Sequence, residues 1–311
     1  MIVSEVKGWE KHGATTARIL AIVVTYKAEK WLKHSLDCLV QAKDLVDIAV
    51  VDNNSPDKTA YLIQRDYKDA VSFFYPHSDN LGFGKAHNLV FRKPYARDYD
   101  YIFLLNQDAE INPVNLRKLV EVADQIPDLG ILSPLHYYDK DTLDIHFAKY
   151  YRKMKSGSIS NEFGEDIAEP IDFVNAAVWL IPQAGFRQVG LFNPIFPHYG
   201  EDGNYVQRVQ AKGLVVAVTS AARALHLRPQ TEIARKNVCS RFAVSQLVVL
   251  SDPKGSLLAK TCQVIFNTFR RAGGELLKRS DPGMTICILK SLADTVGQLR
   301  NIRTYRKVEL W

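Results

Sequence analysis

Three polar clusters in the chain carry residue types that could bind a charged ligand or move a proton. The segment Asn106–Asp108 (Asn-Gln-Asp) offers an amide and a carboxylate, a set that suits a hard divalent cation or a phosphate-bearing ligand. Glu201 and Asp202 are adjacent carboxylates, which could act as a general base or complement a helix start. His226 follows and could be a further ligand. Taken alone, each of these features is also typical of a helix cap, a turn or a core histidine. The choice between these roles and a functional one depends on the fold that positions the residues.

A glycine-bearing segment, Asn80–Asn88 (Asn-Leu-Gly-Phe-Gly-Lys-Ala-His-Asn), precedes a predicted helix. Gly82 and Gly84 allow close backbone approach, and a helix start favours an anion; an ordinary glycine turn is the alternative. No GxGxxG motif follows the first predicted strand, and no GxxxxGK[ST] motif occurs. Nicotinamide and P-loop chemistry are therefore excluded.

The first hundred residues alternate apolar, β-branched runs with helical patterns, which predicts βαβ units and a mostly parallel sheet flanked by helices. The predicted strands are Ile19–Val24, Ile48–Val51, Val71–Tyr75 and Tyr101–Leu105, and the predicted helices are Trp31–Ala42, Ala60–Tyr67 and Gly84–Arg92. Polar residues follow three of the strands, at Thr25, Asp52 and Asn106. Because the carboxyl ends of parallel strands meet at one edge, these residues predict a ligand-binding crevice.

The second half of the chain is less regular. Its predicted strands are Gly130–Ser133 and Leu214–Thr219, with an apolar segment at Ile171–Ile181, and its predicted helices are Asn115–Ile126, Gln183–Val189 and Asp202–Lys212. The segment Tyr137–Pro170 has little periodicity, and Arg223–Asn237 is expected to be a loop. Helical patterns then cover Phe242–Leu250, Leu257–Arg271 and Thr285–Leu299. We expect an N-terminal extension at 1–17, a catalytic α/β domain at 18–237 and a basic helical C-terminal region at 238–311.

The composition of the 311 residues, 47% hydrophobic and 24% charged, is typical of a soluble globular protein. The net charge of +6 arises mainly at the end, because Cys239–Trp311 holds 12 Lys and Arg against 5 Asp and Glu. Those basic residues lack the aromatic interleaving of a nucleic-acid platform. The apolar run Ile19–Val24 is too short for a signal or membrane span, so we expect a cytoplasmic protein.

The cysteines predict reduced thiols and no zinc site, because they show neither CxxC pairing nor a regular framework. The four cysteines are Cys38, Cys239, Cys262 and Cys287.

The ordered segments VVTY, VVDNNS, NLGFGKAHN, LLNQDAE, DFVNAAVWLIP, GLFNP and GEDGNYVQRVQAKG, with a trailing histidine, resemble glycosyltransferase family 2. The resemblance is to its bacterial rhamnosyltransferase-like branch above all. It covers about Arg18 to Pro229, and the helical tail lies outside it. It implies a GT-A fold, a nucleotide-diphosphate sugar donor, Mn²⁺ or Mg²⁺, and inversion at the anomeric carbon.

The resemblance also implies roles for individual residues. Thr25 and Tyr26 would border the nucleobase, Asp52 would hydrogen-bond it, and Asn106 would hold the ribose and diphosphate side. The implied donor-binding residues are together Thr25, Tyr26, Asp52, Asn53, Asn80, Gly82, Asn88, Asn106 and Gln107. Asp108 and His226 would be metal ligands, Asp202 the base, and Glu201 the residue that orients the acceptor.

The chain departs from the usual family pattern at two places. Asn106 stands where Asp is commonest, which removes one negative charge. Cation binding is therefore expected either to be weak without nucleotide or to depend on His226 and the donor's diphosphate. Asn175–Ala177 replaces a frequent small-residue and glycine pattern near Asp172, which leaves the acceptor open.

These features predict an inverting glycosyltransferase that extends a cell-surface glycan such as an O-antigen or capsule. Rhamnose from dTDP-rhamnose is the favoured donor, with a UDP-linked hexose or galactofuranose as substitutes. The alternative, motivated by Asn106, is a catalytically silent nucleotide-sugar-binding or scaffold protein. A nucleotidyltransferase is disfavoured because Val24–Ala28 contains no glycine.

The helix predicted at Leu257–Arg271 carries an apolar stripe formed by Leu258, Cys262, Ile265, Phe266 and Phe269. Such a stripe usually packs against a core. The alternative is a helix on a membrane surface, favoured by the basic balance of this region. In that case the protein would associate peripherally with the inner face of a membrane and act on a lipid-linked glycan acceptor.

Overall fold

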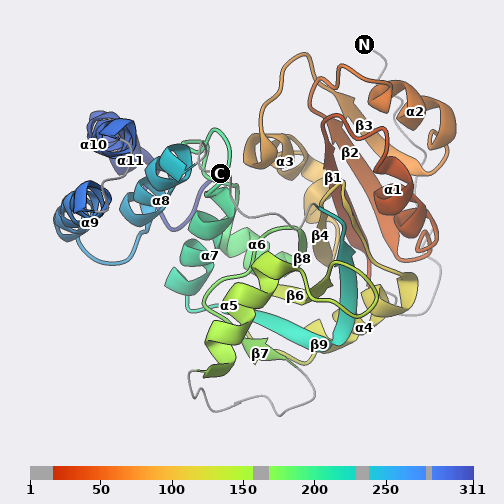
Figure 1. Ribbon diagram of the computed structural model, residues 1–311. Helices are drawn as coiled ribbons and strands as arrows, with labels where there is room; N and C mark the ends of the chain where they lie inside the picture. The colour runs from red at the N-terminus through yellow and green to blue at the C-terminus, as the bar shows by residue number, and fades with distance from the viewer. Residues whose placement is uncertain (1–16, 157–167, 229–237, 278–281) are drawn as a thin grey trace.

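The structure is a computed structural model that describes residues 17–156, 168–228, 238–277 and 282–311. An α/β domain carries a group of C-terminal helices on one side (Figure 1). The strands are β1 (Ile19–Thr25), β2 (Val46–Asp52), β3 (Val71–Pro76), β4 (Tyr101–Leu105), β5 (Ala109–Glu110), β6 (Leu129–Tyr137), β7 (Glu169–Pro170), β8 (Val178–Pro182) and β9 (Val215–His226). They form one sheet in the order β3-β2-β1-β4-β8-β6-β9-β5, with β7 paired to β9.

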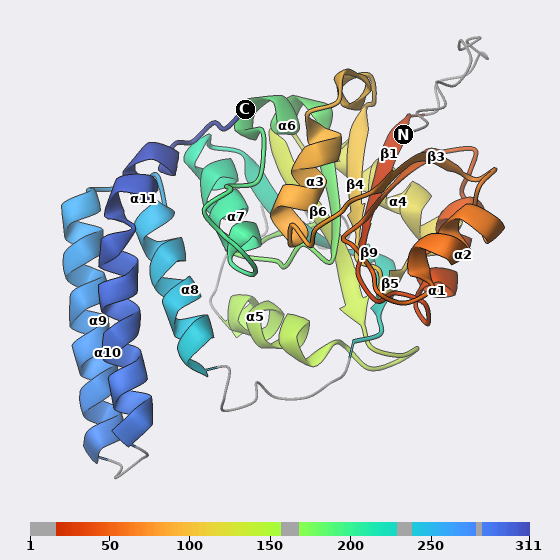
Figure 2. The same cartoon turned by 90° about the horizontal axis from the view of Figure 1, so that it is seen from above.

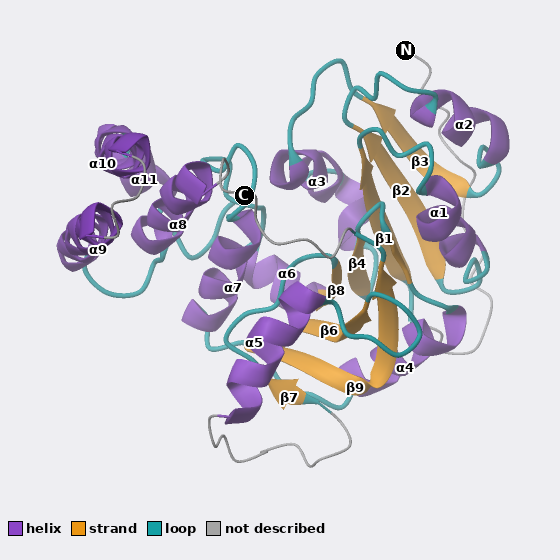
Figure 3. Ribbon diagram, viewed as in Figure 1, coloured by secondary structure: helices purple, strands orange, loops and turns teal. Residues whose placement is uncertain are grey.

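Helices cover the sheet on both sides (Figure 3). In this domain they are α1 (Leu32–Val40), α2 (Thr59–Asp66), α3 (Phe83–Phe91), a 3-10 helix (Pro94–Arg97), α4 (Pro113–Ala123), α5 (Ile145–Ser156), α6 (Gln183–Val189) and α7 (Glu201–Ala211). Strands β3, β2, β1 and β4 are mutually parallel. Their continuous apolar runs follow from burial on both faces, as in Ile19–Val23, where every side chain is fully buried. The predicted α/β fold, mostly parallel and flanked by helices, is confirmed.

Two parts of the second half differ from the prediction. Strand β9 continues to His226, so the expected loop at Arg223–Asn237 is wrong for its first residues; residues 229–237 lie outside the described part. The strand continues because β6 pairs with it beyond a register shift and β5 pairs with its end. Helix α5 occupies the segment where periodicity was weak, and its start is capped by Asp144, whose Oδ1 accepts the N–H groups of His146 and Phe147 at 2.9 and 2.8 Å.

The C-terminal helices are α8 (Val238–Ser251), α9 (Leu257–Leu277), α10 (Pro282–Gly297) and α11 (Leu299–Tyr305). Helices α9 and α10 lie side by side, with α8 toward the α/β domain (Figures 1 and 2). The predicted absence of disulfides is wrong, because Cys239 and Cys287 are bonded and join α8 to α10, a pairing that sequence spacing does not reveal. Cys38 and Cys262 are free.

The end of the chain returns to the α/β domain after α11. The N–H of Leu191 donates to the carbonyl of Leu310 at 2.7 Å, and the guanidinium of Arg97 lies 4.9 Å from the centre of the Trp311 ring. The helical region is therefore attached through both α8 and its last residues. The division of the chain at residue 238 stays a prediction.

The apolar stripe on α9 faces solvent. Leu258, Phe266 and Phe269 are 73%, 67% and 59% exposed, whereas the helix buries Val264 and Thr268. The expected packing of this stripe against a core is thus wrong, because α8 and α10 cover a different face. Within the described ranges, no helix has the length and apolar character needed to cross a membrane.

Candidate active site

Asp108 and His226 are brought together by the short pairing of β5 with the end of β9. In that register Ala109 lies opposite His226, and the N–H of Leu227 donates to the Asp108 carbonyl at 2.8 Å. The His226 Nε2 and an Asp108 carboxylate oxygen are 3.6 Å apart. The two residues proposed from sequence as metal ligands therefore face one another.

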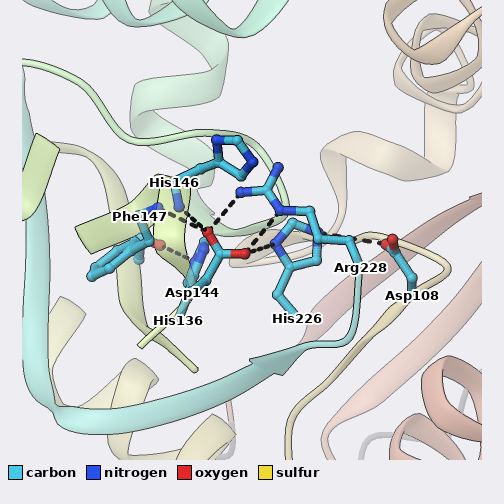
Figure 4. A network of polar contacts seen from close by, with 8 residues as sticks. Asp108, His136, Asp144, His146, Phe147, His226 and Arg228 are labelled. Atoms are coloured by element: carbon cyan, nitrogen blue, oxygen red, sulfur yellow. Dashed lines mark hydrogen bonds and ion pairs between the residues drawn. The ribbon is translucent and has the colours of Figure 1, made fainter. Parts of the chain in front are cut away.

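Asp144 stands behind His226 and was not anticipated from the sequence (Figure 4). Its carboxylate is completely buried, accepts two hydrogen bonds from the Arg228 guanidinium at 2.8 and 2.7 Å, and lies 3.8 Å from His226 Nδ1. Burial lowers the pKa of the neighbouring His136 to about 3, so that ring is neutral near pH 7. The Arg228 guanidinium compensates the charge of Asp144 through these two hydrogen bonds.

The donor set fits a divalent cation shared with a bound ligand. Asp108 offers a carboxylate and His226 an imidazole nitrogen, which suit Mn²⁺; Mg²⁺ is commonly held by one or two carboxylates plus substrate phosphates and water. No group of three His, Cys, Asp or Glu residues suited to a metal occurs in the described ranges. The remaining positions would fall to a diphosphate and water.

Glu201 and Asp202 begin α7 directly after a turn in the left-handed region. Tyr199 has φ 65° and Gly200 has φ 86°, and a Cβ on Gly200 would lie 2.7 Å from Val244. The N–H of Gly203 donates to Asp202 Oδ1 at 2.7 Å. This turn sets both carboxylates at the start of the helix.

Both carboxyl groups hold protons more tightly than usual. Burial, and secondarily the charge of Asp202, raises the pKa of Glu201 to about 7. Burial also raises the pKa of Asp202. One oxygen of Glu201, Oε2, has no hydrogen-bond partner among the described residues, so the group is available to a ligand.

The glycine segment lies against the turn that precedes α7. Gly82 has φ 76°, and a Cβ there would be 2.4 Å from the carbonyl oxygen of Pro197, so this close approach requires glycine. Asn53 holds the segment by donating to the Gly82 carbonyl at 3.2 Å and accepting the N–H of Leu81 at 3.3 Å. The side-chain oxygen of Asn80 accepts the Gly82 N–H at 2.9 Å.

Other residues assigned to donor binding hold the strand ends together. Asp52 accepts the hydroxyls of Thr25 and Ser55 at 2.8 and 2.6 Å. The Gln107 side chain pairs with the backbone of Tyr26, accepting its N–H at 2.7 Å and donating to its carbonyl at 3.2 Å.

Asn88 is buried and pairs with the backbone of Phe192, donating and accepting at 2.8 Å. These contacts give Asn88, Asp52 and Gln107 positioning roles. Their direct contact with a donor stays a prediction.

A cavity of about 230 Å³ is lined by several of these polar groups but not by Asp108, whose carboxylate lies 3.6 Å from the lining residue His226. Its polar lining residues are Asn106, Asn175, His198, Tyr199, Glu201, Asp202, His226 and Arg228. The cavity therefore brings Asn106 and His226 together with the carboxylates of α7. Thr25, Tyr26 and Asp52 are not among its lining residues.

Sequence reasoning missed Asp144 and Arg228. Asp144 lies in a segment without periodicity, and its partner is 84 residues away in the chain. The only local signal for Arg228 is its position two residues after His226.

Comparison with known proteins gives one family. The profile of Glycosyl transferase family 2 matches residues 20–175. A low-salt glycan biosynthesis hexosyltransferase of Haloferax volcanii is 22% identical over 219 residues, 67% of this chain and 66% of that protein. An N-acetylglucosaminyl-diphospho-decaprenol L-rhamnosyltransferase of Mycobacterium tuberculosis is 24% identical over 231 residues, 66% of this chain and 74% of that protein.

Solved structures agree on the fold. TarS of S. aureus, in complex with UDP-GlcNAc, superposes with a TM-score of 0.57 at 16% identity, over 94% of this chain and 90% of that one. A mannosyltransferase from Pyrobaculum calidifontis, in complex with GDP-Man and Mn²⁺, gives 0.56 at 14% identity, over 97% and 88%. The chain therefore belongs to glycosyl transferase family 2 and is a nucleotide-sugar glycosyltransferase of GT-A fold.

Proposed function

We propose that the protein is an inverting, divalent-cation-dependent hexosyltransferase that transfers its sugar to a hydroxyl of a growing cell-surface glycan. The observation that carries the proposal is one cavity lined both by Asn106, His226 and Arg228 and by the carboxylates of Glu201 and Asp202. Inversion needs a leaving-group site and a base on opposite sides of the anomeric carbon. The cavity supplies groups of both kinds.

On the leaving-group side, Asp108 and His226 would hold Mn²⁺ or Mg²⁺, which stabilises negative charge on a departing diphosphate when bound. Arg228 adds a guanidinium to the lining of the cavity, and Asn106 adds an amide that can hydrogen-bond the sugar nucleotide. These residues bind and orient the donor.

On the acceptor side, Asp202 would accept the proton of the attacking hydroxyl, a role worth about 10²- to 10⁴-fold in rate. The raised pKa of Asp202 makes its carboxylate a better proton acceptor than an ordinary aspartate. Glu201, with a pKa of about 7 and one unpartnered oxygen, would hydrogen-bond the acceptor and orient it.

The favoured donor is dTDP-rhamnose, supported by the motif resemblance and by likeness to the mycobacterial rhamnosyltransferase. UDP-hexoses and UDP-galactofuranose are the substitutes. The name of that relative also supports a lipid-linked glycan as the acceptor. The final product would be a cell-surface glycan such as an O-antigen or capsule.

The test is calorimetric titration with UDP-, dTDP- and GDP-nucleotides, each with Mn²⁺ and with chelator. We expect one nucleotide to bind selectively and more tightly with Mn²⁺. Equal binding of all three, or no effect of the metal, would contradict the proposal.

A second candidate is a silent nucleotide-sugar-binding protein, favoured by Asn106 in place of the usual aspartate. It predicts the same metal-dependent binding without sugar transfer to any acceptor and without slow hydrolysis of the sugar nucleotide. Hydrolysis of the bound sugar nucleotide, detected as the appearance of free nucleotide, would exclude the silent protein.

We further propose peripheral attachment to an anionic membrane through α9 and α10. The exposed apolar side chains on these helices are Leu258, Ile265, Phe266, Phe269, Leu276, Leu277, Ile286, Leu289 and Val296. Arg270 and Lys290 lie beside them in sequence, and the helical region carries 12 basic against 5 acidic residues.

Sedimentation with vesicles containing phosphatidylglycerol measures this attachment. We expect binding that weakens with salt and falls in Phe266→Ser/Phe269→Ser, with folding unchanged because both side chains are exposed. Equal sedimentation of this double variant and the parent protein would contradict it.

A further inference from the structure

A second, larger cavity adjoins the active-site cavity. Its volume is about 500 Å³, and it lies between the start of α7 and one face of α8. Its lining residues are Phe173, Tyr199, Gly200, Asp202, Gly203, Arg241, Val244, Ser245, Val248 and Val249. Tyr199 and Asp202 line both cavities, so the proposed base stands where the two meet.

The α8 wall is one face of a helix, because its residues recur at intervals of three and four. Three of them, Val244, Val248 and Val249, are valines that are only partly buried. Leu247 and Leu250, which do not line the cavity, belong to a buried cluster with Phe196, Val264 and Ile302, and Val248 and Val249 pack against the same cluster. These valines of α8 thus join that cluster to the cavity at the start of α7.

Two glycines at the start of α7 allow α8 to pack close to α7 without side chains that would fill the space between them. A Cβ on Gly200 would meet Val244 at 2.7 Å, and a Cβ on Gly203 would lie 3.4 Å from Val248. Helix α8 is also fixed to α7 by the amide of Asn204, which donates to the carbonyl and hydroxyl oxygens of Ser251 at 3.2 and 3.0 Å. The cavity walls are thus held by direct contacts.

Arg241 supplies a positive charge where the apolar wall meets the catalytic cavity. Its guanidinium carbon lies 5.3 Å from the centre of the Tyr199 ring, and Tyr199 lines both cavities. The side chain is exposed. A phosphate bound at this junction would face both Arg241 and the acceptor side of Asp202.

We propose that the second cavity binds the hydrocarbon chain of an acceptor whose sugar is joined to that chain through phosphate, with Arg241 contacting the phosphate. The inference rests on the proposed role of Asp202, since the acceptor hydroxyl must reach that carboxylate. Valine and phenylalanine walls suit a hydrocarbon chain, and the hydrogen-bonding side chains of the lining, apart from Ser245, are Tyr199, Asp202 and Arg241, of which Tyr199 and Asp202 also line the active-site cavity. The C-terminal helical region then takes part directly in acceptor choice.

The probe is farnesyl phosphate, titrated calorimetrically into the whole protein saturated with the nucleotide that binds its donor site. Val248→Trp fills the cavity and should weaken binding about tenfold, as expected for excluding a few buried methylene groups. Arg241→Gln should weaken binding of farnesyl phosphate but not of farnesol. Val114→Trp, at a 62% exposed position of α4 outside the cavity, is the matched control and should bind as the parent does.

Nucleotide affinity of each variant reports separately on its folding and on the donor site. If the parent protein does not bind farnesyl phosphate, or if Val248→Trp binds it unchanged, the inference fails while the proposed function stands. Loss of farnesyl phosphate binding in Phe266→Ser/Phe269→Ser but not in Val248→Trp would assign the chain to the exposed α9 stripe and overturn the proposal. Absence of any nucleotide binding would instead overturn the proposed function.

Discussion

Asp144 and Glu201 are both buried carboxylates near one cavity, 0% and 5% exposed, but their surroundings differ. Asp144 accepts two hydrogen bonds from Arg228 and two from backbone N–H groups. Glu201 has an acidic neighbour, Asp202, and one unpartnered oxygen. The first environment stabilises a permanent charge, whereas the second makes a charge costly.

Under the proposed function, this difference separates two tasks in one site. A cation and a diphosphate would be held by Asp108 and by Arg228, whose charge Asp144 compensates. Under the proposed function, proton transfer needs a carboxyl group that accepts a proton readily, and burial raises the pKa of both Glu201 and Asp202. Each prediction below tests one side of this comparison.

Asp202→Asn should have the largest effect. It removes the proposed base with little change in volume, so sugar transfer should fall about 10²- to 10⁴-fold. Nucleotide binding, which involves the other side of the cavity, should stay close to that of the parent. Steady-state transfer rates and calorimetry on the same preparation measure both; retained turnover would move the base to Glu201.

Asp108→Ala should weaken nucleotide binding in Mn²⁺ by more than the roughly tenfold expected for loss of an outer-shell partner. In chelator the affinity should be unchanged, because the carboxylate acts through the cation. Nucleotide titrations with and without Mn²⁺ make the comparison. An equal loss in chelator would make Asp108 a structural residue.

Glu201→Gln should change how stability depends on pH. The pKa of Glu201 is raised from 4.5 to about 7 in the folded protein, so folding is favoured by protonation. This contribution is fully present below pH 4.5 and is lost as the pH rises through 7. It amounts to about 3 kcal/mol. Denaturant unfolding at several pH values should show a smaller decline in the variant than in the parent, because Asp202, whose pKa is also raised, still titrates in the variant.

Asp202→Asn is the control for that pH effect, because it removes the neighbouring charge but keeps the Glu201 carboxyl. It should reduce the decline in stability without abolishing it, because it removes the charge and the titration of Asp202 while burial, the first cause of the Glu201 shift, remains. If the free energy of unfolding declined equally with pH in Glu201→Gln and in the parent, the titrating group would not be Glu201.

The sheet and most helices were predictable because their signals are local. Runs such as Tyr101–Leu105 are continuously apolar where both faces are buried, and the polar residues that follow them mark the ligand edge. His226 and the two carboxylates at the start of α7 were predicted as site residues because each stands within a short, local motif.

The features that could not be predicted depend on contacts distant in sequence. Asp144 meets Arg228 across 84 residues, and Cys239 meets Cys287 across 48. The α9 stripe was ambiguous because periodicity identifies an apolar face but not its partner. Which face is buried was decided by the packing of α8 and α10.

Asp144→Asn is the most direct test of the carboxylate whose charge is compensated by Arg228. The amide keeps the shape of the side chain and can still accept the N–H groups that cap α5, but it removes the negative charge facing Arg228 and His226. Because outer-shell carboxylates orient metal-binding histidines, we expect Mn²⁺-dependent nucleotide affinity to fall about tenfold. Arg228→Gln is the matched control, since it removes the other charge of the pair.

If Asp144 acts mainly by orienting His226, then Asp144→Asn should weaken binding only in the presence of Mn²⁺. Arg228→Gln should weaken it with Mn²⁺ and with chelator alike, because its guanidinium contacts the ligand without the metal. Identical metal dependence in the two variants would mean that Asp144 serves only to hold Arg228. In that case the guanidinium of Arg228 would be the group that acts on the ligand. The contrast with Glu201 would then rest on the Asp144–Arg228 ion pair alone.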